Sequence, residues 1–549
     1  MLVSNKKSAL FIKSYCKQAG IEHIVLCPGS RNLPLIVNFS NDPHFKVYSI
    51  IDERIAGFFA LGIVKALRKP ALVITTSGSA AVNLAPAMVE AYYQRLPLIA
   101  ITADRPASFI NKGENQTMLQ RGIFSNFVGL ELEIEEKLEF EAFEMKIQVL
   151  HSFLGNPSQV NNVHINLPFS EPLDKIENIL GDYQFKWKAE GLKSKKTNAS
   201  KMHFAKGQNV MIYLSSSCAN ETLNKLLDLG VENKNWVVIS EHHSGWYHPK
   251  GITRIDAILT RDKGIQKPDI LITIGETMLS KKFRNYIKSF QNILHYDLSS
   301  YPRNWNNLTS KYQAIHLDYK HLNDILDFEN TSFFQAAWLE AEKIALDHHV
   351  LFVENRDYTE FKLIEKIVNT IDRESAIYWG NSSGVRYGNW TSWKFKPQLV
   401  HLANRGVSGI DGVLASALGY RSVSIDGDFY CILGDISMLY ESNSLSALSF
   451  IDRIKIIVIN NHGGKIFEQI HQSQHLGHTH ALVTPHKQNF ESLAKQFDLE
   501  YYISRDLNSF SSQWEQVKAS PAKLIFEINI GENETDLWED YFRAPKNQE

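Results

Sequence analysis

The sequence predicts an α/β protein built from three doubly wound parallel sheets, each in its own domain. Apolar runs of four to eight residues alternate with longer helical patterns, as expected for parallel strands covered by helices on both faces. A chain of 549 residues exceeds what one hydrophobic core can organise, so several domains are expected. With 44% apolar and 21% charged residues, the composition is that of an ordinary globular protein.

The first domain is expected at residues 1–185. Its strand candidates are the apolar runs 23–27, 71–76, 96–103 and 163–168, which alternate with helical patterns. After Pro172 the pattern weakens, and the polar, lysine-rich stretch 186–201 is predicted to be a linker.

Two further domains are expected at residues 202–345 and 356–549. The middle domain has strand candidates at 209–214, 235–240 and 269–275 and is Rossmann-like in pattern, although it has no GxGxxG motif. Residues 333–356 are predicted to be helical and to lead into the third domain. That domain has strand candidates at 376–380, 430–435 and 454–460.

Charge and cysteine content exclude several classes of protein. The formal net charge of -2 gives no basic surface for nucleic acid, and no apolar run approaches the length of a membrane span. The four cysteines are far apart and form no CxxC pair, which fits a reducing compartment. We therefore expect a cytoplasmic protein without nucleic-acid binding or membrane insertion.

Two predicted strands of the third domain end in glycine beside an oxygen-bearing side chain. ILGDIS places Asp435 after Gly434, and VINNHGG places Asn461 before Gly463 and Gly464. Such glycines let a phosphate approach the main chain, while carboxylate and amide oxygens are the ligands that Mg²⁺ prefers. Because ligands of parallel sheets bind beyond the carboxyl ends of the strands, we expect a divalent ion and a diphosphate here.

Asp435 and Asn461 are 26 positions apart, which leaves room for a helix and a further strand between them. Glycine-aspartate followed at such an interval by asparagine is typical of thiamine-diphosphate proteins. Each residue alone also fits a helix cap or a turn, and only the combination favours the cofactor. Asp428, in DGDF, is a second candidate, but Asp435 is preferred because it directly follows the apolar strand.

Glu53 is the predicted catalytic residue. Thiamine diphosphate needs a carboxylate against its aminopyrimidine ring, so that the cofactor can deprotonate its own thiazolium carbon. Glu53 lies in IDER, between an apolar strand and a largely apolar helix, although the helix dipole alone also favours glutamate there. Gly78 permits close backbone approach in a second such turn, TTSGSAA, which capping by Ser77 or Ser79 explains equally well.

Four arginines follow predicted strand ends or turns: Arg31, Arg105, Arg386 and Arg405. A single arginine more often forms a surface ion pair, but four beside strand-end motifs favour recognition of carboxylates, which guanidinium groups bind bidentately. Three of them, Arg31, Arg105 and Arg405, lie in the motifs CPGSRNLPL, TADRP and NRGVSGIDG. Further motifs are IDERIAGFFALG, TSGSAAVNLAPAMVEA, ENQT, GDISMLY and INNHGGKIF. Together the motifs resemble the menaquinone-pathway synthases that make 2-succinyl-5-enolpyruvyl-6-hydroxy-3-cyclohexene-1-carboxylate. They cover the first and third predicted domains.

The resemblance implies roles for individual residues. The residues implied to contact isochorismate are Ser30, Arg31, Arg105 and Gln116, with Asn115 nearby. Those implied to hold 2-oxoglutarate or its succinyl remnant are Arg386 and Arg405, and Lys281, next to Lys282, would add a positive charge from the middle domain. The implied cofactor residues are Gly78, Ile410, Gly434, Asp435, Ile436, Ser437, Asn461, Gly463, Gly464, Ile466 and Phe467.

Within this set, Asp435, Asn461 and the carbonyl of Gly463 would bind Mg²⁺ or Mn²⁺. Ile410 would support the bent cofactor and Ile466 and Phe467 would form an apolar wall, although all three are also ordinary core residues. The family often has a third asparagine where this chain has His462, which we interpret as a tolerated turn residue.

The implied reaction is thiamine-diphosphate-dependent decarboxylation of 2-oxoglutarate, followed by 1,4-addition of the succinyl carbanion to isochorismate with release of CO₂. The implied active form is a homodimer, because related enzymes hold the cofactor between two subunits, and a homotetramer is compatible with this. Two alternatives remain open. One is another thiamine-diphosphate carboligase, similar to acetolactate synthase, and the other is a non-catalytic ligand-binding protein on the same fold.

Overall fold

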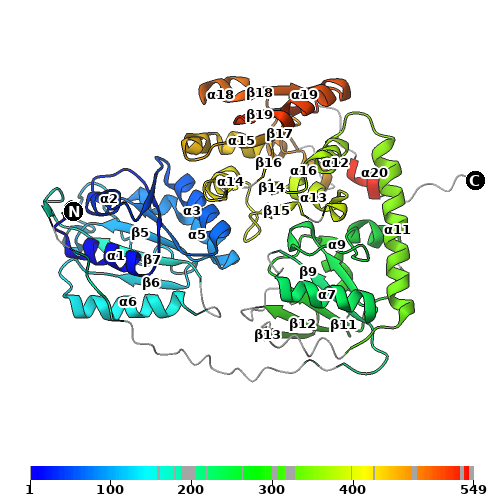
Figure 1. Cartoon of the computed structure of the whole chain (residues 1–549), viewed down its shortest axis with the longest axis horizontal. Helices are drawn as coiled ribbons and strands as arrows, with labels where there is room; N and C mark the ends of the chain where they lie inside the picture. The colour runs from blue at the N-terminus through cyan, green and yellow to red at the C-terminus, as the bar shows by residue number, and fades with distance from the viewer. Residues whose placement is uncertain are drawn as a thin grey trace, which may run out of the picture. The chain divides into compact units, whose positions relative to one another are not determined.

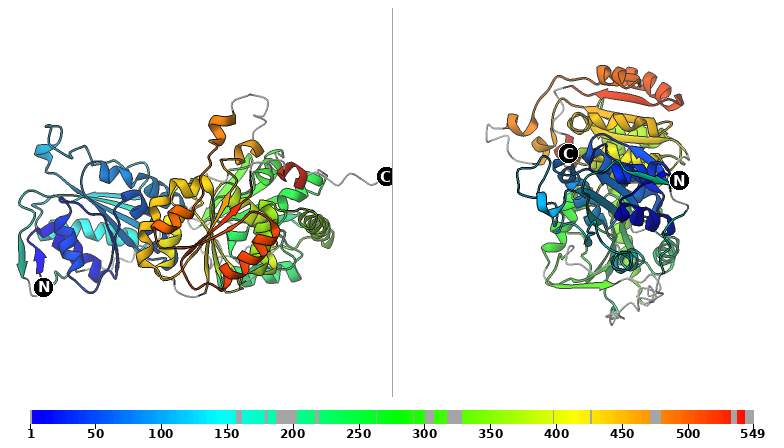
Figure 2. Two further views of the ribbon diagram at one scale, coloured as in Figure 1. Left: turned by 90° about the horizontal axis from the view of Figure 1, so that it is seen from above. Right: turned by 90° about the vertical axis from the view of Figure 1, so that its left-hand side faces the viewer.

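The computed structural model describes residues 2–156, 161–178, 181–186, 202, 204–216, 220–262, 264–290, 292–299, 307–316, 328–396, 398–424, 427–470, 479–531 and 537–542. Within these residues it contains three parallel sheets of five or six strands and one antiparallel pair (Figure 1). Figure 2 gives two further views of the strands and their flanking helices. The predicted α/β fold class with three doubly wound sheets is confirmed.

The first sheet has six parallel strands in the order β3-β2-β4-β5-β7-β6. Its strands are β2 (His23–Leu26), β3 (Lys46–Ser49), β4 (Ala71–Thr75), β5 (Leu98–Asp104), β6 (Leu130–Glu133) and β7 (Val163–Pro168). The helices of this part are α1 (Lys7–Gln18), α2 (Leu33–Ser40), α3 (Glu53–Leu67), α4 (Ser79–Asn83), α5 (Ala85–Gln94) and α6 (Phe140–Leu154). The antiparallel pair is formed by β1 (Leu2–Ser4) and β8 (Ile176–Asn178).

The second sheet has five parallel strands in the order β10-β9-β11-β12-β13. Its strands are β9 (Val210–Leu214), β10 (Val237–Ser240), β11 (Ile270–Ile274), β12 (Leu294–Ser299) and β13 (Lys311–His316). The helices that alternate with them are α7 (Glu221–Asn233), α8 (Ile255–Arg261) and α9 (Lys281–Lys288), and the long α11 (Ser332–Glu354) follows.

The third sheet has six parallel strands in the order β15-β14-β16-β17-β19-β18. Its strands are β14 (Ala376–Trp379), β15 (Val400–Ala403), β16 (Phe429–Gly434), β17 (Lys455–Asn460), β18 (Glu500–Ser504) and β19 (Leu524–Asn529). The helices in this part of the sequence are α12 (Glu360–Thr370), α13 (Ser383–Trp390), α14 (Val413–Arg421), α15 (Asp435–Tyr440), the 3₁₀ helix η6 (Ser442–Phe450), α16 (Ile466–Ile470), α17 (Thr479–Val483), α18 (Glu491–Gln496), α19 (Leu507–Ala519) and α20 (Leu537–Phe542).

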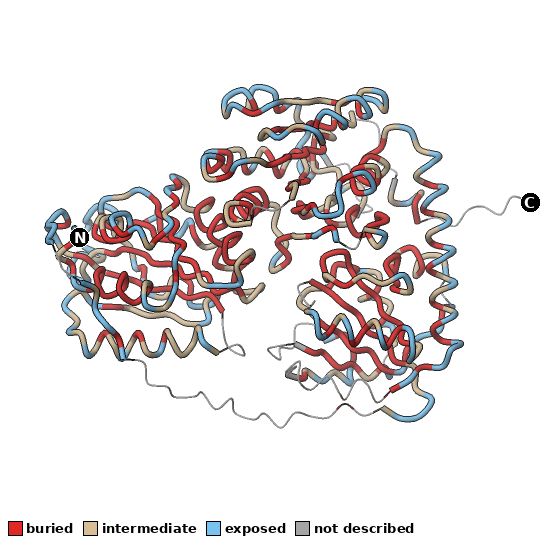
Figure 3. The backbone as a smooth tube through the Cα atoms, in the orientation of Figure 1, coloured by how far each residue is buried: buried red, intermediate tan, exposed pale blue. Residues whose placement is uncertain are grey.

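All strand candidates named from the sequence are present, with ends that move by up to two residues. Their apolar runs are mostly buried, as the red segments of the tube in Figure 3 indicate. The patterns missed strands such as β6 and β18, whose sequences LELE and EYYIS are polar and half-buried because they lie at sheet edges. Among the described helices, none combines the length and apolar character needed to cross a bilayer.

The chain forms two compact units, and each unit is made of segments that are not consecutive in the sequence. The first unit consists of residues 1–194, 404–425 and 440–452, and the second of 195–403, 426–439 and 453–549. Helices α14 and η6 therefore belong to the first unit, although the sequence assigned them to the third domain. The boundaries 1–185, 202–345 and 356–549 stay a prediction, and the stretch 187–201 of the predicted linker lies outside the described residues.

Helix α14 belongs to the first unit because it packs tightly against α3. A Cβ atom at Gly62 would lie 2.1 Å from the carbonyl oxygen of Ser416, and one at Gly419 would lie 1.9 Å from that of Phe59. Only glycine at these two positions lets the backbones approach so closely. The loop 404–412, which precedes α14, is thereby attached to the same helix that begins with Glu53.

A buried glutamate caps the N-terminus of α14. Glu441 Oε2 accepts hydrogen bonds from the backbone N–H groups of Leu414 and Ala415, at 2.7 and 3.1 Å. Burial raises the pKa of this carboxyl to about 8, although the two N–H donors act in the opposite direction. The structure therefore favours a neutral Glu441 at neutral pH.

We predict that Glu441→Gln weakens the pH dependence of stability. Because the folded-state pKa of about 8 exceeds the ordinary value of 4.5, folding takes up a proton between these values. The stability from this group is complete below pH 4.5 and is lost as the pH rises through about 8. Melting temperatures measured across this range should fall less steeply for the glutamine variant than for the wild type. Equal slopes would contradict the shifted pKa.

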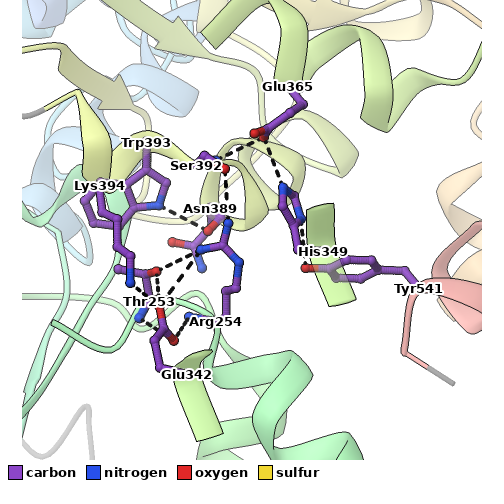
Figure 4. A network of polar contacts seen from close by, with 10 residues as sticks. All are labelled: Thr253, Arg254, Glu342, His349, Glu365, Asn389, Ser392, Trp393, Lys394 and Tyr541. Atoms are coloured by element: carbon purple, nitrogen blue, oxygen red, sulfur yellow. Dashed lines mark hydrogen bonds and ion pairs between the residues drawn. The ribbon is translucent and has the colours of Figure 1, made fainter. Parts of the chain in front are cut away.

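In the second unit, a buried polar network joins helices and loops that are far apart in the sequence (Figure 4). Glu342, on α11, accepts a hydrogen bond from the backbone N–H of Arg254 at 3.0 Å and pairs with Lys394 at 2.7 Å. Glu365, on α12, accepts a hydrogen bond from the backbone N–H of Ser392 at 3.0 Å. Because buried charges are costly unless paired, the network holds these segments in one arrangement.

Candidate active site

Three of the predicted residues lie where the strand order of the first sheet reverses, between β2 and β4. The turn after β2 carries Ser30 and Arg31, and the turn after β4 carries Gly78. The backbone N–H of Arg31 donates to Thr76 Oγ1 at 3.2 Å, so the two turns are joined directly. Ligands of doubly wound sheets bind at such a position.

Gly78 lies beside the segment that carries Gln116. Its φ of +78° is in the left-handed region, and a Cβ atom there would lie 3.3 Å from Gln116 Cα. Ser77 Oγ donates to the carbonyl oxygen of Gln116 at 3.0 Å, and the N–H of Gly78 donates to Gln120 Oε1 at 2.7 Å. The structure thus brings Gly78 and Gln116 together, while Asn115 and Gln116 are exposed.

Arg31 and Arg105 lie close enough to influence each other electrostatically. Arg31 Nη1 donates to the carbonyl oxygen of Phe169 at 2.9 Å, and Nη2 pairs with Glu171 Oε1 at 2.8 Å. Burial and the positive charge of Arg105 lower the pKa of Arg31. The Nε atoms of both arginines are buried and have no hydrogen-bond partner among the described residues. Two neighbouring cations with unused donors are suited to an anionic ligand.

Glu53 is the first residue of α3, as the sequence predicts. Asp52 caps this helix by accepting a hydrogen bond from the N–H of Ile55 at 3.1 Å. Glu53 Oε2 accepts a hydrogen bond from Asn83 Nδ2, at the end of α4, at 3.1 Å. Burial and the charges of Glu53 and Asp52 raise the pKa of the nearby Cys27 thiol, which keeps it protonated. The Glu53 carboxylate is half-buried and is available to a ligand.

Asp435 and Asn461 follow neighbouring strands of the third sheet. In the register of β16 and β17, Gly434 is paired with Ile459, so both strands end at the same edge. Asp435 is 2% exposed, and its Oδ2 accepts a hydrogen bond from the N–H of Gly463 at 3.0 Å. The turn after β16 and the turn after β17 are therefore bound to each other, beside the point where the strand order reverses.

Asn461 has a defined orientation that suits a metal ligand. Its Nδ2 donates to Glu360 Oε1 at 2.6 Å, and burial raises the pKa of Glu360. With its amide nitrogen facing Glu360, Asn461 directs its amide oxygen away from that carboxyl group. Asn461 Oδ1 is buried without a hydrogen-bond partner among the described residues. An orphaned hard oxygen beside a buried aspartate fits Mg²⁺ or Mn²⁺.

No group of three or more His, Cys, Asp or Glu side chains suited to a metal occurs in the described part of the chain. The candidate centre at Asp435 and Asn461 therefore depends on mixed ligands: one carboxylate, one amide and a backbone carbonyl. This is a donor set for a hard cation and not for zinc.

The glycine pair after Asn461 is packed under a later segment. A Cβ atom at Gly463 would lie 2.8 Å from Val483 Cγ1, and the N–H of Gly464 donates to the carbonyl oxygen of Val483 at 2.6 Å. His462 has a φ of +63°, a left-handed conformation in which histidine is tolerated. His462 thus occupies a tight turn, which agrees with its interpretation as a turn residue.

Asp428 lies at the opposite end of β16 from Asp435. It precedes the first residue of the strand, and its Oδ2 pairs with the buried Lys455 at 2.8 Å. A residue at the amino end of a parallel strand is far from the edge where ligands bind. This placement favours Asp435 over Asp428.

The remaining candidates are characterised by their positions on helices or loops and by their exposure. Arg386, on α13, donates to the carbonyl oxygen of Ser382, whose φ of +69° is unusual for serine. Ile436 and Ser437 lie in the first turn of α15. Ile410 and Ile466 are half-buried and Phe467 is 38% exposed, so none of the three belongs to a buried core. Lys281 is exposed at the start of α9, whereas the adjacent Lys282 packs against the ring of Phe542.

Three buried residues that contact the predicted site were not foreseen: Glu90, Gln120 and Glu360. Each receives hydrogen bonds from a site segment that is distant in the sequence. A sequence pattern contains no signal for such pairings. The only hint is a polar residue at a position where the helical or loop pattern buries the side chain.

Comparisons with known proteins agree with this geometry. Residues 7–124 match the family described as thiamine pyrophosphate enzyme, N-terminal TPP binding domain, and residues 386–525 match the corresponding C-terminal TPP binding domain. These ranges contain Glu53 in one case and Asp435 with Asn461 in the other. The chain is therefore a thiamine-diphosphate enzyme.

Curated relatives extend the match over nearly the whole chain. A protein of Flavobacterium johnsoniae is 31% identical, with 96% of this chain and 97% of its own length covered. One of Flavobacterium psychrophilum is also 31% identical, with coverage of 95% and 96%, and one of Bacteroides fragilis is 29% identical over the full length of both chains. All three are named 2-succinyl-5-enolpyruvyl-6-hydroxy-3-cyclohexene-1-carboxylate synthase. This chain belongs to that family of synthases.

Proposed function

We propose that this enzyme decarboxylates 2-oxoglutarate and adds the resulting four-carbon unit to isochorismate. The products are 2-succinyl-5-enolpyruvyl-6-hydroxy-3-cyclohexene-1-carboxylate and CO₂. The proposal combines the family to which the chain belongs with the chemistry of its strand-end residues. The observation that supports it most directly is the pair Arg31 and Arg105, two mutually repelling cations with unused donors.

The substrate residues are assigned by charge. Isochorismate carries carboxylates, and Arg31 and Arg105 would bind one of them with help from Ser30, Asn115 and Gln116. The residues assigned to 2-oxoglutarate are Arg386, Arg405 and Lys281. A dicarboxylate needs cations at both ends, whereas pyruvate needs them at only one.

Bound thiamine diphosphate would supply the carbon nucleophile and the electron sink for decarboxylation. Asp435, Asn461 and the carbonyl of Gly463 would hold the metal ion that binds its diphosphate, and the metal is Mg²⁺ or Mn²⁺. The apolar wall is assigned to Ile410, Ile466 and Phe467, and the remaining cofactor contacts are assigned to Gly78, Gly434, Ile436, Ser437 and Gly464.

Glu53 would hold and exchange one proton at Oε1 in this scheme. Asn83 donates to Oε2, which fixes the carboxylate and leaves Oε1 for the ring of the cofactor. A carboxylate held in this way can favour the ring tautomer that accepts a proton, and no protein nucleophile is required. We further propose a cytoplasmic homodimer as the active form, with a homotetramer as its higher assembly.

The proposal is tested by measuring CO₂ release with thiamine diphosphate and Mg²⁺ present. We expect release from 2-oxoglutarate and, when isochorismate is added, formation of the coupled product in equal amount. Release from pyruvate in preference to 2-oxoglutarate would instead support an acetolactate-synthase-like carboligase. No release from either acid, with the cofactor bound, would support a non-catalytic protein.

A further inference from the structure

The loop 404–412, between β15 and α14, is held by a carboxylate to which neither the sequence motifs nor the proposed function assigns a role. Glu90, on α5, is 2% exposed, and both of its oxygens face this loop. Oε1 accepts a hydrogen bond from the N–H of Gly406 at 2.6 Å, and Oε2 accepts one from the N–H of Val407 at 2.7 Å. The two N–H groups directly follow Arg405, so the clamp fixes the backbone on the carboxyl side of that arginine.

The loop has no space to move toward α5. A Cβ atom at Gly406 would lie 2.7 Å from the carbonyl oxygen of Glu90 and 3.0 Å from its Cδ. Gln94, one turn further along α5, also donates to Glu90 Oε1, which fixes the carboxylate from its other side. The clamp therefore has a single geometry, set by the helix.

The two ends of the loop are also held together. Asn404 Nδ2 donates to the carbonyl oxygen of Gly412 at 3.1 Å and to Ser416 Oγ at 3.0 Å. Asn404 Oδ1 lies 3.4 Å from Nζ of Lys65, a buried residue of α3. Burial lowers the pKa of Lys65 to about 7, while the charge of Glu90 opposes this shift. Glu90 therefore binds the loop directly and also stabilises the charged form of Lys65.

This arrangement connects the loop to the catalytic helix. Helix α3 carries Glu53 at its start and Lys65 near its end, and Gly412 at the end of the loop contacts Phe58 of the same helix. A buried carboxylate is costly unless donors satisfy it, and the donors that satisfy Glu90 include two consecutive peptides beside Arg405. The hydrogen bonds that stabilise the buried Glu90 carboxylate therefore also fix the backbone beside Arg405, the arginine assigned to the substrate.

We propose that Glu90 is a positioning residue that sets the direction of Arg405 toward the carboxylate of the 2-oxoacid. It acts through the peptides of Gly406 and Val407 and does not itself touch the substrate. The inference rests on the proposed function, because the substrate of Arg405 is assigned there.

The first measurement is the steady-state kinetics of Glu90→Gln. Glutamine keeps the size of the side chain but has only one accepting oxygen, so its amide group must face one of the two N–H donors. We expect KM for 2-oxoglutarate to rise about 10- to 100-fold, in line with a small displacement of a binding group. KM for isochorismate, whose residues lie outside this loop, should stay within about twofold of the wild type.

A double-mutant cycle separates positioning from general destabilisation. Arg405→Ala removes the group on which Glu90 is inferred to act. If Glu90 acts through Arg405, adding Glu90→Gln to Arg405→Ala should produce no further rise in KM for 2-oxoglutarate. Equal fold-changes in the presence and absence of Arg405 would overturn the inference, as would an unchanged KM in the single variant.

Glu441→Gln serves as the matched control. Glu441 is another buried glutamate of the first unit that accepts two consecutive backbone N–H groups, but these belong to Leu414 and Ala415 of α14. Its KM for 2-oxoglutarate should stay within about twofold of the wild type. If Glu90→Gln does not fold, Glu90→Asp replaces it, and a rise in KM for 2-oxoglutarate alone is again expected. A wild-type enzyme that does not turn over 2-oxoglutarate would refute the proposed function instead.

Discussion

Glu53→Gln is expected to lower kcat by about 10²–10⁴-fold, the range that a positioned proton-transfer group contributes. Glutamine keeps the size of the side chain and can still accept a hydrogen bond from Asn83, so the local structure should remain. It cannot exchange a proton with the cofactor. Binding of thiamine diphosphate in the presence of Mg²⁺, measured by calorimetry, should therefore be retained while turnover is lost.

Glu221→Gln is a matched control for this experiment. Glu221 is also the first residue of a helix, α7, and the preceding Asn220 caps that helix as Asp52 caps α3. Both substitutions remove a negative charge from a helix N-terminus, so both weaken a favourable interaction with the helix dipole. Only Glu53→Gln should affect turnover. A fully active Glu53→Gln enzyme would mean that Glu53 is no more than a residue favoured by the helix dipole.

The fold could be predicted from the sequence because the strands of a parallel sheet are buried on both faces. Such strands appear as continuous apolar runs, as in the run ALVIT of β4 and the run KIIVIN of β17. Edge strands such as β6 are half-exposed and polar, and no comparable signal marks them. Packing between distant helices was also invisible: the sequence shows Gly62 and Gly419, but only the structure shows their carbonyl partners.

The candidate site could be predicted only in part, and the reason is again physical. Residues at strand ends are found from local sequence, because an apolar run followed by glycine and a polar residue marks the position, as at Asp435 and Gly78. Their orientation depends on partners far away in the chain. Asn461 is oriented by Glu360, 101 positions earlier, and the loop of Arg405 is clamped by Glu90, 316 positions before Gly406.

Asp435→Asn is expected to reduce the affinity for the divalent metal severely. Loss of a residue that merely orients a metal ligand costs about 10–100-fold in metal affinity, so loss of a charged ligand should cost at least as much. The substitution keeps the size of the side chain and removes its negative charge. The affinity for Mn²⁺ in the presence of thiamine diphosphate, measured by electron paramagnetic resonance, tests this without reference to turnover.

Asp428→Asn distinguishes a loss of ligation from a general loss of charge in the third sheet. Asp428 is the nearer of the two aspartates to the start of β16, and its ion pair with Lys455 at 2.8 Å has a structural role. Its removal should lower the melting temperature and leave the affinity for Mn²⁺ within about twofold of the wild type. Unaltered affinity for Mn²⁺ in Asp435→Asn, or a larger loss in Asp428→Asn, would contradict a metal site at the carboxyl end of β16. Since ligands bind at the carboxyl ends of parallel strands, the same two measurements also test where in this sheet the diphosphate is held.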